Sequence, residues 1–156
     1  YSIVIANEQS KKESILISRK HPKAYIEDVS WSPDGKFIAS PTMIFGETYA
    51  AGIAVVDVET GEEKQIPLKA EKILKINRAK WVNEGKGLVF SVGTRYQLRY
   101  AAYPGGEVQN ITNDLTSYDD FSLTANGRGI WNGATAISGR LIPNSRWNCF
   151  LMKRVC

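Results

Sequence analysis

A short segment occurs three times in this chain of 156 residues and constrains its fold more than any other feature. The copies read VSWSPDGKFIAS (29–40), AKWVNEGKGLVFS (79–91) and FSLTANGRGIW (121–131). They align in two columns, one of Trp31, Trp81 and Leu123 and one of Gly35, Gly85 and Gly127. The offsets are 50 and then 42 residues. A period of this length predicts an array of similar structural units.

Each copy consists of two β-prone runs joined by a polar turn that ends in glycine, which is typical of a tight hairpin. Asp34-Gly35 and Asn126-Gly127 are residue pairs that tolerate a positive φ, and Pro33 fixes φ before the first of them. Glu84-Gly85 keeps only the glycine, so the second turn is the least well specified.

A second pair of predicted strands follows each hairpin, at 52–68 and 96–112, so each period holds four strands. A four-stranded meander cannot bury both faces alone, and such units stack radially, each sheet covering its neighbour. The predicted fold class is all-β, a partial β-propeller of about two and a half four-stranded antiparallel blades. We expect Trp31 and Trp81 to lie in the contacts between sheets.

The propeller segment is expected to span 1–130. Its parts are a blade remnant at 1–25, blades at 26–68 and 77–113, and the first hairpin of another blade at 119–131. The remnant contains YSIVIA and ESILIS, which look like the later strands of a blade. The region 68–79 is predicted to be a connecting loop. Because 132–156 has no acidic residue, no clear alternation and no repeat match, we expect this basic tail to pack poorly or to be disordered. A divergent tail and a variant capping segment both remain open.

The net charge of +4 does not indicate a basic binding face. All 16 acidic residues lie at or before Asp120 and five basic residues follow it, so residues 1–120 carry a net charge of −1. We therefore expect no nucleic-acid partner. The longest apolar run, 49–56, is far shorter than the ~20 residues of a membrane helix, so no membrane contact is expected from this segment. The chain opens inside a strand-like run, and we interpret it as a fragment of a longer protein.

Titratable residues offer weak candidates for chemistry. His21 is the only histidine, which excludes a histidine metal cluster, and its setting indicates an exposed loop. Asp114 with Asp119-Asp120 could bind a cation, although a strand-entry role is favoured. Asp34 and Asp57 are interpreted as turn residues. We predict no catalytic residue, no cofactor and no metal site.

Two further groups have both a structural and a functional interpretation. Tyr96, Tyr100 and Tyr103 alternate with Arg95 and Arg99, a pattern that can stack nucleobases, but a strand with one buried face is preferred. The two cysteines, Cys149 and Cys156, match neither a zinc nor a redox spacing and are interpreted as incidental thiols.

The motif WSPDGKFIA resembles that of TolB-like, WD-repeat-like bacterial β-propellers. The stretch YPGGEVQNITNDLTSYDDFSLTANGR (103–128) resembles a segment of the propellers that follow the kinase domain in membrane-bound bacterial Ser/Thr protein kinases. Related propellers follow a winged-helix DNA-binding domain in some bacterial regulators. The resemblance covers about 1–130, and the chain departs from it after Arg128.

The resemblance implies a non-catalytic binding or sensory scaffold, periplasmic or otherwise extracytoplasmic, attached to an effector. Implied partners are a protein, peptide or small ligand at the propeller loops, and the remaining blades of the same propeller. The glycine-rich loop, V-A-I-K, H-R-D and D-F-G motifs of a kinase are absent from this sequence.

Two alternative functions remain open. One is the propeller portion of a prolyl-oligopeptidase-type peptidase, although the sequence has no G-x-S-x-G elbow. The other is a TolB-type periplasmic interaction protein. Because an open blade array leaves apolar end faces, we also expect the isolated chain to oligomerise or aggregate.

Overall fold

The computed structural model describes residues 2–7, 9–18, 24–26, 28–44, 50–68, 75–93, 97–113, 117–123, 128–133, 137–140 and 149–150. Strands make up most of these ranges, and the helical element found in them is a short 3-10 turn, Asn83–Gly85. Within the same ranges no helix is long and apolar enough to cross a membrane.

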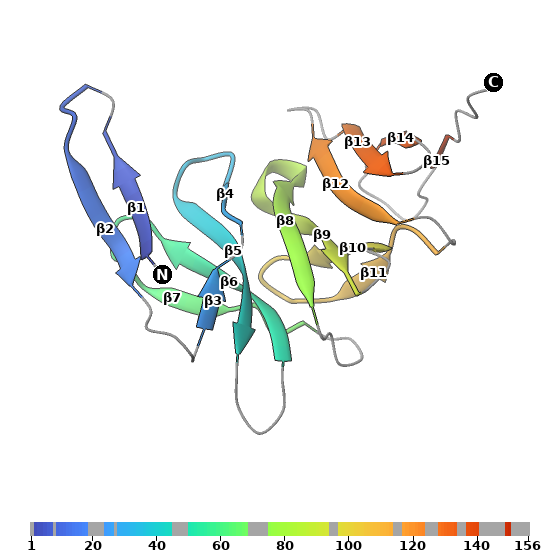
Figure 1. Ribbon diagram of the computed structural model, residues 1–156, viewed down its shortest axis with the longest axis horizontal. Coiled ribbons are helices and arrows are strands. Elements are labelled where there is room, and N and C mark those ends of the chain that lie inside the picture. Colours follow the sequence, from blue (N-terminus) through green and yellow to red (C-terminus); the bar gives the residue numbers. More distant parts are fainter. Residues whose placement is uncertain are drawn as a thin grey trace.

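Four antiparallel sheets, here called blades I to IV, follow one another in sequence order (Figure 1). Blade I contains β1 (Ser2–Ala6) and β2 (Glu13–Ser18). Blade II contains β3 (Ala24–Ile26), β4 (Ser30–Trp31), β5 (Phe37–Ile44), β6 (Ala50–Asp57) and β7 (Glu63–Gln65). Blade III contains β8 (Ile76–Val82), β9 (Gly87–Val92), β10 (Gln97–Ala102) and β11 (Val108–Asn110). Blade IV contains β12 (Tyr118–Leu123), β13 (Arg128–Gly133), β14 (Ile137–Arg140) and β15 (Cys149–Phe150).

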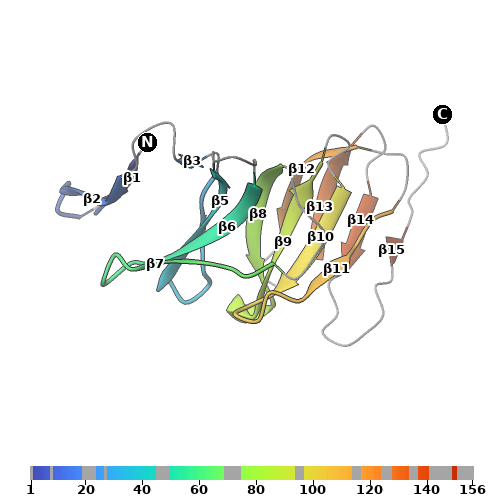
Figure 2. The same cartoon turned by 90° about the horizontal axis from the view of Figure 1, so that it is seen from below.

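Each of blades II to IV is an up-and-down meander in which successive strands pair (Figure 2). In blade II the first strand is split into β3 and β4, which both pair with β5. The predicted all-β architecture of stacked four-stranded blades is therefore confirmed. Blade II starts at or before Ala24, slightly earlier than the expected boundary at 26, because β3 already pairs with β5.

The first strand of each of these blades carries one residue more than its partner strand at the same place in the repeat. The extra residue lies between Ile26 and Ser30, between Ile76 and Ala79, and between Tyr118 and Asp120. Such a bulge bends the strand and increases its twist. Its recurrence shows that the repeat extends to backbone irregularities as well as to side chains.

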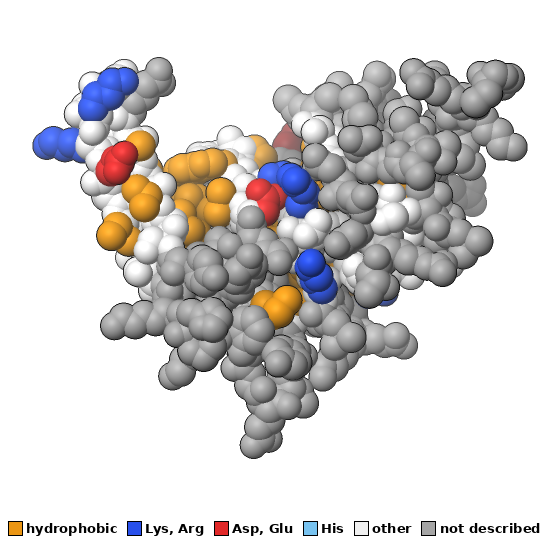
Figure 3. Space-filling model, viewed as in Figure 1, with side chains coloured by type: hydrophobic (Ala, Val, Ile, Leu, Met, Phe, Trp, Pro, Cys, Tyr) orange, Lys and Arg blue, Asp and Glu red, His pale blue; other side chains and the backbone are white. Residues whose placement is uncertain are grey.

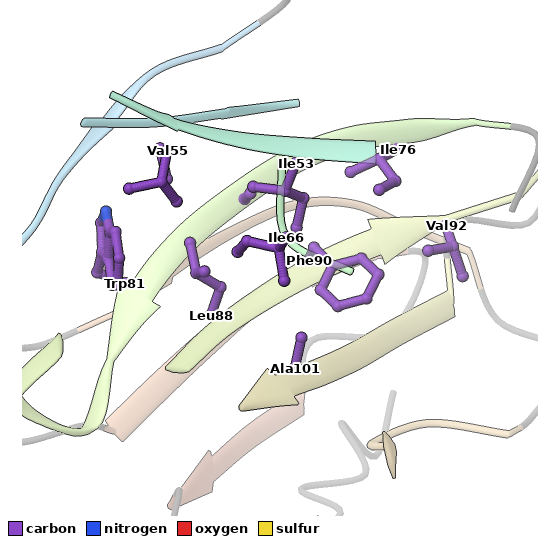
Figure 4. Packing of buried hydrophobic residues seen from close by; sticks show 11 residues of the cluster. Ile53, Val55, Ile66, Ile76, Trp81, Leu88, Phe90, Val92 and Ala101 are labelled. Carbon is purple, nitrogen blue, oxygen red and sulfur yellow. The ribbon is translucent and has the colours of Figure 1, made fainter. Parts of the chain in front are cut away.

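Strand alternation gives blade III two buried faces. Between blades II and III, one cluster joins Ile53, Val55 and Ile66 to Trp81, Leu88 and Phe90 (Figure 4). A second cluster joins Val82, Val89 and Leu98 of blade III to Tyr118 and Phe121 of blade IV. Because successive side chains of a strand point to opposite faces, the neighbours Trp81 and Val82 enter different clusters. The core of the molecule is thus the set of seams between blades.

In blades II and III the turn between the first two strands and the turn between the last two strands lie at the same end, here called the turn end, and are joined by a backbone hydrogen bond. In blade II the amide of Val58 donates to the carbonyl of Lys36 at 2.9 Å. In blade III the amide of Tyr103 donates to the carbonyl of Lys86 at the same distance. This repeated bond holds the two turns together in both blades.

The tail beyond 131 contributes backbone to blade IV. β13 ends at Gly133, β14 pairs with it, and β15 pairs with β14. The described backbone of the tail therefore continues the meander, while the expectation of poor packing or disorder stays a prediction, because the side chains of the tail lie outside the described residues. Sequence alternation did not indicate these strands, and the other residues of the tail lie outside the described ranges.

The second repeat turn, which the sequence predicts to be the least well specified, holds a strained residue. Glu84 has φ of 55° and ψ of 33°, in the left-handed region that most side chains disfavour. We expect Glu84→Asn to raise the free energy of unfolding by about 0.5–1 kcal/mol, because asparagine tolerates this conformation better. Chemical denaturation measures the change, with Glu59→Asn at an exposed turn position as the matched control. Equal effects of the two substitutions would contradict this interpretation.

Candidate functional site

Trp81 forms the centre of the seam between blades II and III. Its indole Nε1 donates to the carbonyl of Ser30 at 3.0 Å, and its amide donates to the Ser30 hydroxyl at 3.4 Å. Tyr103 packs edge-on against the indole, with ring centroids 5.0 Å apart at 83°. The first strand of one blade therefore covers the first-strand tryptophan of the next.

Trp31 occupies the same repeat column but has a different environment. It is 49% exposed, whereas Trp81 is 7% exposed. Two positions earlier in the repeat, Val29 is 42% exposed, but its counterparts Ala79 and Phe121 are buried. The expectation of an inter-sheet contact is thus met by Trp81, while Trp31 and Val29 form an exposed apolar surface, here called the Val29–Trp31 patch.

This patch faces blade I. Ser30 directs its hydroxyl to Trp81 in blade III, so the adjacent Trp31 side chain points to the opposite face of the strand. Blade I lies on that side of blade II in Figures 1 and 2. Figure 3 shows hydrophobic side chains gathered over blade I and the adjoining part of blade II. The other large exposed hydrophobic residues found in the described ranges, Val4 and Ile15, are cross-strand partners in blade I.

The bulges of the first strands place polar residues next to the seams. Asp28 lies in the bulge of blade II, and its Oδ2 is 2.9 Å from the Nζ of Lys80 in β8. Both side chains are about three-quarters buried, at 22% and 28% exposure. This ion pair ties two first strands together, and sequence reasoning missed it because its partners lie in different repeats.

Asp34 and Asp57 accept hydrogen bonds within their own turns. Asp34 Oδ1 accepts two hydrogen bonds, one from the Ser32 hydroxyl at 2.6 Å and one from the Lys36 amide at 3.1 Å. These bonds lower the pKa of Asp34. The amide of Thr60 donates to Asp57 Oδ1 at 2.8 Å and is the main cause of the lowered pKa of Asp57. Both carboxylates are occupied in shaping turns.

The lowered pKa of Asp57 predicts a pH-dependent contribution to stability. A carboxyl group whose pKa falls on folding stabilises the fold above its unfolded value, near 3.8, and this contribution is lost as pH falls through the folded value. We expect Asp57→Asn to be less stable than wild type at neutral pH, and the stabilities of the two proteins to converge at a pH below the folded pKa of Asp57. Denaturation at neutral pH and at that low pH measures the difference in stability, and a difference that does not change with pH would contradict the prediction. Asparagine fits this turn, as Asn7 shows in the corresponding turn of blade I.

The predicted aromatic group lies in two seams. Tyr103 contacts Phe37 of blade II at 6.2 Å between ring centroids, in addition to Trp81, and burial raises its pKa. Tyr100 packs against the cluster between blades III and IV. The two rings therefore serve opposite faces of blade III, where a single buried face was expected. Tyr96 and Arg95 lie outside the described residues.

The remaining predicted residues divide into three groups. Leu123 is partly buried against the cluster between blades III and IV, and Pro33, Gly35 and Gly85 lie in hairpin turns. Asp119 and Asp120 lie in β12, where only their backbone is described. His21, Asp114, Asn126, Gly127 and Cys156 lie outside the described ranges, and only the backbone of Cys149 is described. Among the described residues there is no group of three His, Cys, Asp or Glu side chains that could hold a metal ion.

Comparison with solved structures identifies this arrangement of blades. TolB from Acinetobacter baumannii matches 88% of the chain with a TM-score of 0.64 at 17% identity. The fold is that of a TolB-like β-propeller. Dipeptidyl peptidase 4 from Porphyromonas gingivalis matches 83% with a TM-score of 0.60 at 12% identity, and a chain of the nidogen/laminin complex matches 85% with a TM-score of 0.65 at 9% identity.

The chain spans only part of each of these similar proteins. It covers 34% of the TolB chain, 26% of the peptidase and 49% of the nidogen/laminin chain. No protein-family model matches the sequence, and no curated protein matches it significantly. The likeness to these solved structures establishes the propeller fold and nothing beyond the fold.

Proposed function

We propose that this chain is a non-catalytic binding segment of a β-propeller, within the C-terminal sensor region of a membrane-bound bacterial Ser/Thr protein kinase or a winged-helix regulator. The observation that carries the proposal is the TolB-like fold combined with the resemblance of 103–128 to propellers that follow a kinase domain. The segment is extracytoplasmic in this proposal. It binds a protein, peptide or small ligand at the loops of the blade array.

Two features of the described residues support a binding scaffold. The hydrogen bonds between turns hold the turn ends of blades II and III in a fixed arrangement, as a binding surface requires. Asp34 and Asp57, which were considered for chemistry, have structural partners in their turns, and Asp28 pairs with Lys80. A protein partner is favoured by the similar chain that occurs in a nidogen/laminin complex.

The reading frame that surrounds the chain tests this proposal. A kinase or winged-helix domain followed by a membrane span before Tyr1 is the expected result. A hydrolase domain with a G-x-S-x-G elbow would overturn it in favour of the alternative, a propeller portion of a prolyl-oligopeptidase-type peptidase. That alternative is favoured by the fold shared with dipeptidyl peptidase 4. A reading frame with neither a kinase or winged-helix domain nor a hydrolase domain would instead favour a TolB-type interaction protein.

The non-catalytic part of the proposal has its own measurement. Purified chain incubated with a mixture of fluorogenic peptides is expected to release no more fluorophore than heat-denatured chain. Turnover that scales with the concentration of folded chain would overturn this part. The mixture probes peptidase chemistry because the alternative function belongs to that class.

A further inference from the structure

Ser30 ties the first strand of blade II to the first strand of blade III. Its carbonyl accepts the Trp81 indole N–H at 3.0 Å, and its hydroxyl accepts the Trp81 amide at 3.4 Å. Trp81 is buried, so both hydrogen bonds are partly shielded from water, which strengthens them. This serine–tryptophan pair, here called the clamp, joins the two blades at the edge formed by their first strands.

The same two repeat columns hold different residues at the seam between blades III and IV. Lys80 takes the place of Ser30, at the offset of 50 residues, and Leu123 takes the place of Trp81, at the offset of 42. A lysine side chain has no hydrogen-bond acceptor and a leucine side chain has no donor. Neither bond of the clamp can therefore form at these columns of the seam between blades III and IV.

Lys80 instead adds a second tie to the seam between blades II and III. It lies between Ala79 and Trp81 in β8, and because both of these side chains face blade II, strand alternation starts the Lys80 side chain on the opposite face. Its flexible stem still brings the ammonium to within 2.9 Å of Asp28 Oδ2 in blade II, and this oxygen is buried. The residue that replaces serine in blade III thus binds backwards.

Further contacts join blades II and III away from the first strands. The rings of Phe37 and Tyr103 meet at the turn end, with centroids 6.2 Å apart. In the outer part of the seam, Gly106 approaches the Pro67 carbonyl so closely that a Cβ would collide with it. Ties at the inner edge, the turn end and the outer part together fix the orientation of one blade relative to the other.

The described side chains of the cluster between blades III and IV are apolar or aromatic, and this packing is non-directional. We propose that Ser30 and Lys80 lock blades II and III into one rigid unit, and that the blade array changes shape by movement at the seam between blades III and IV. Lys80 is the positioning residue of this device, because its charge holds the Asp28–Ser30 segment over Trp81. The inference is independent of the effector and of the ligand proposed above.

Two adjacent buried residues of β9 report the two seams separately. Leu88 faces blade II and Val89 faces blade IV, and both are 0% exposed. A single cysteine replaces one or the other in the full chain, with Cys149→Ser and Cys156→Ser in both proteins. The rate of thiol labelling is measured under native conditions in which the seams reclose faster than the reagent reacts.

We expect Val89→Cys to be labelled at least about tenfold faster than Leu88→Cys. Leucine loses more volume than valine on replacement by cysteine, and the larger cavity favours opening at Leu88→Cys. The effect of side-chain size therefore opposes the expected order and cannot produce it.

Variants of Lys80 test the lock itself. Lys80→Met leaves the Asp28 carboxylate buried without its partner, so labelling of Leu88→Cys should accelerate at least about tenfold. Labelling of Val89→Cys should stay within about twofold of its former rate, because the other seam already opens without the lock. Lys80→Arg keeps the charge and should preserve the slow labelling of Leu88→Cys.

Any of three results would overturn the lock. Equal labelling of the two cysteines with Lys80 in place would show that the array opens as one unit. Equal acceleration of both cysteines by Lys80→Met would assign its effect to general destabilisation. Labelling of Leu88→Cys that is as fast with Lys80→Arg as with Lys80→Met would show that the charge at this position does not hold the seam.

Discussion

Replacing Trp81 with alanine will lower the free energy of unfolding by about 3–5 kcal/mol, whereas Trp31→Ala will lower it by less than about 1 kcal/mol. The two tryptophans share a repeat column, but Trp81 is buried between two blades and Trp31 is half exposed. Truncation at Trp81 empties the centre of a seam and leaves the Ser30 carbonyl without its indole donor. Urea denaturation followed by far-UV circular dichroism measures both changes.

Trp81→Phe supplies the control for this comparison. Phenylalanine keeps most of the buried ring but lacks the N–H donor. The loss of unfolding free energy for Trp81→Phe should therefore lie between the losses for Trp31→Ala and Trp81→Ala. The measurements need a low chain concentration, so that association through the Val29–Trp31 patch does not add to the apparent stability of wild type. A loss at Trp31→Ala as large as that at Trp81→Ala would show that Trp31 is covered in solution.

The contrast between these tryptophans shows what the repeat pattern can and cannot predict. Turn chemistry is local, so Pro33, Asp34 and Gly35 in sequence were enough to predict the first hairpin. Alternation and period predicted four-stranded sheets stacked face to face. Burial of a column depends on the blade that precedes it, and this information lies outside the repeat unit itself. The same residue type in the same column therefore has opposite environments.

Features that join different repeats escaped prediction for a similar reason. The Asp28–Lys80 pair connects the first strand of blade II to the first strand of blade III. The charged residues within either repeat alone do not indicate a partner in the other repeat. The recurring bulge in the first strand is a backbone irregularity that single-sequence alternation does not reveal. In blade IV, β14 and β15 lack an alternating pattern, so their backbone pairing with the preceding strands was not expected.

The outer part of the seam between blades II and III depends on glycine at 106. Gly106 lies in the β10–β11 turn with φ of 78°, and a Cβ at this position would collide with the carbonyl of Pro67, which follows the last strand of blade II. Glycine is therefore required both for the left-handed backbone and for the close approach of two blades. Gly93 has nearly the same φ, 77°, but nothing lies within 4 Å of the position that its Cβ would take.

We expect Gly106→Ala to lower the free energy of unfolding by about 2–5 kcal/mol and Gly93→Ala by about 1–2 kcal/mol. Both variants carry the cost of a side chain at positive φ, so the difference between them isolates the steric conflict at the seam. Pro67 is fixed by the neighbouring Ile66, which is buried in the cluster between the blades, and cannot move away without opening that cluster. Urea denaturation of the two variants measures the difference. Equal losses would show that the β10–β11 turn moves independently of blade II, and the seam would then be held by its inner strands alone.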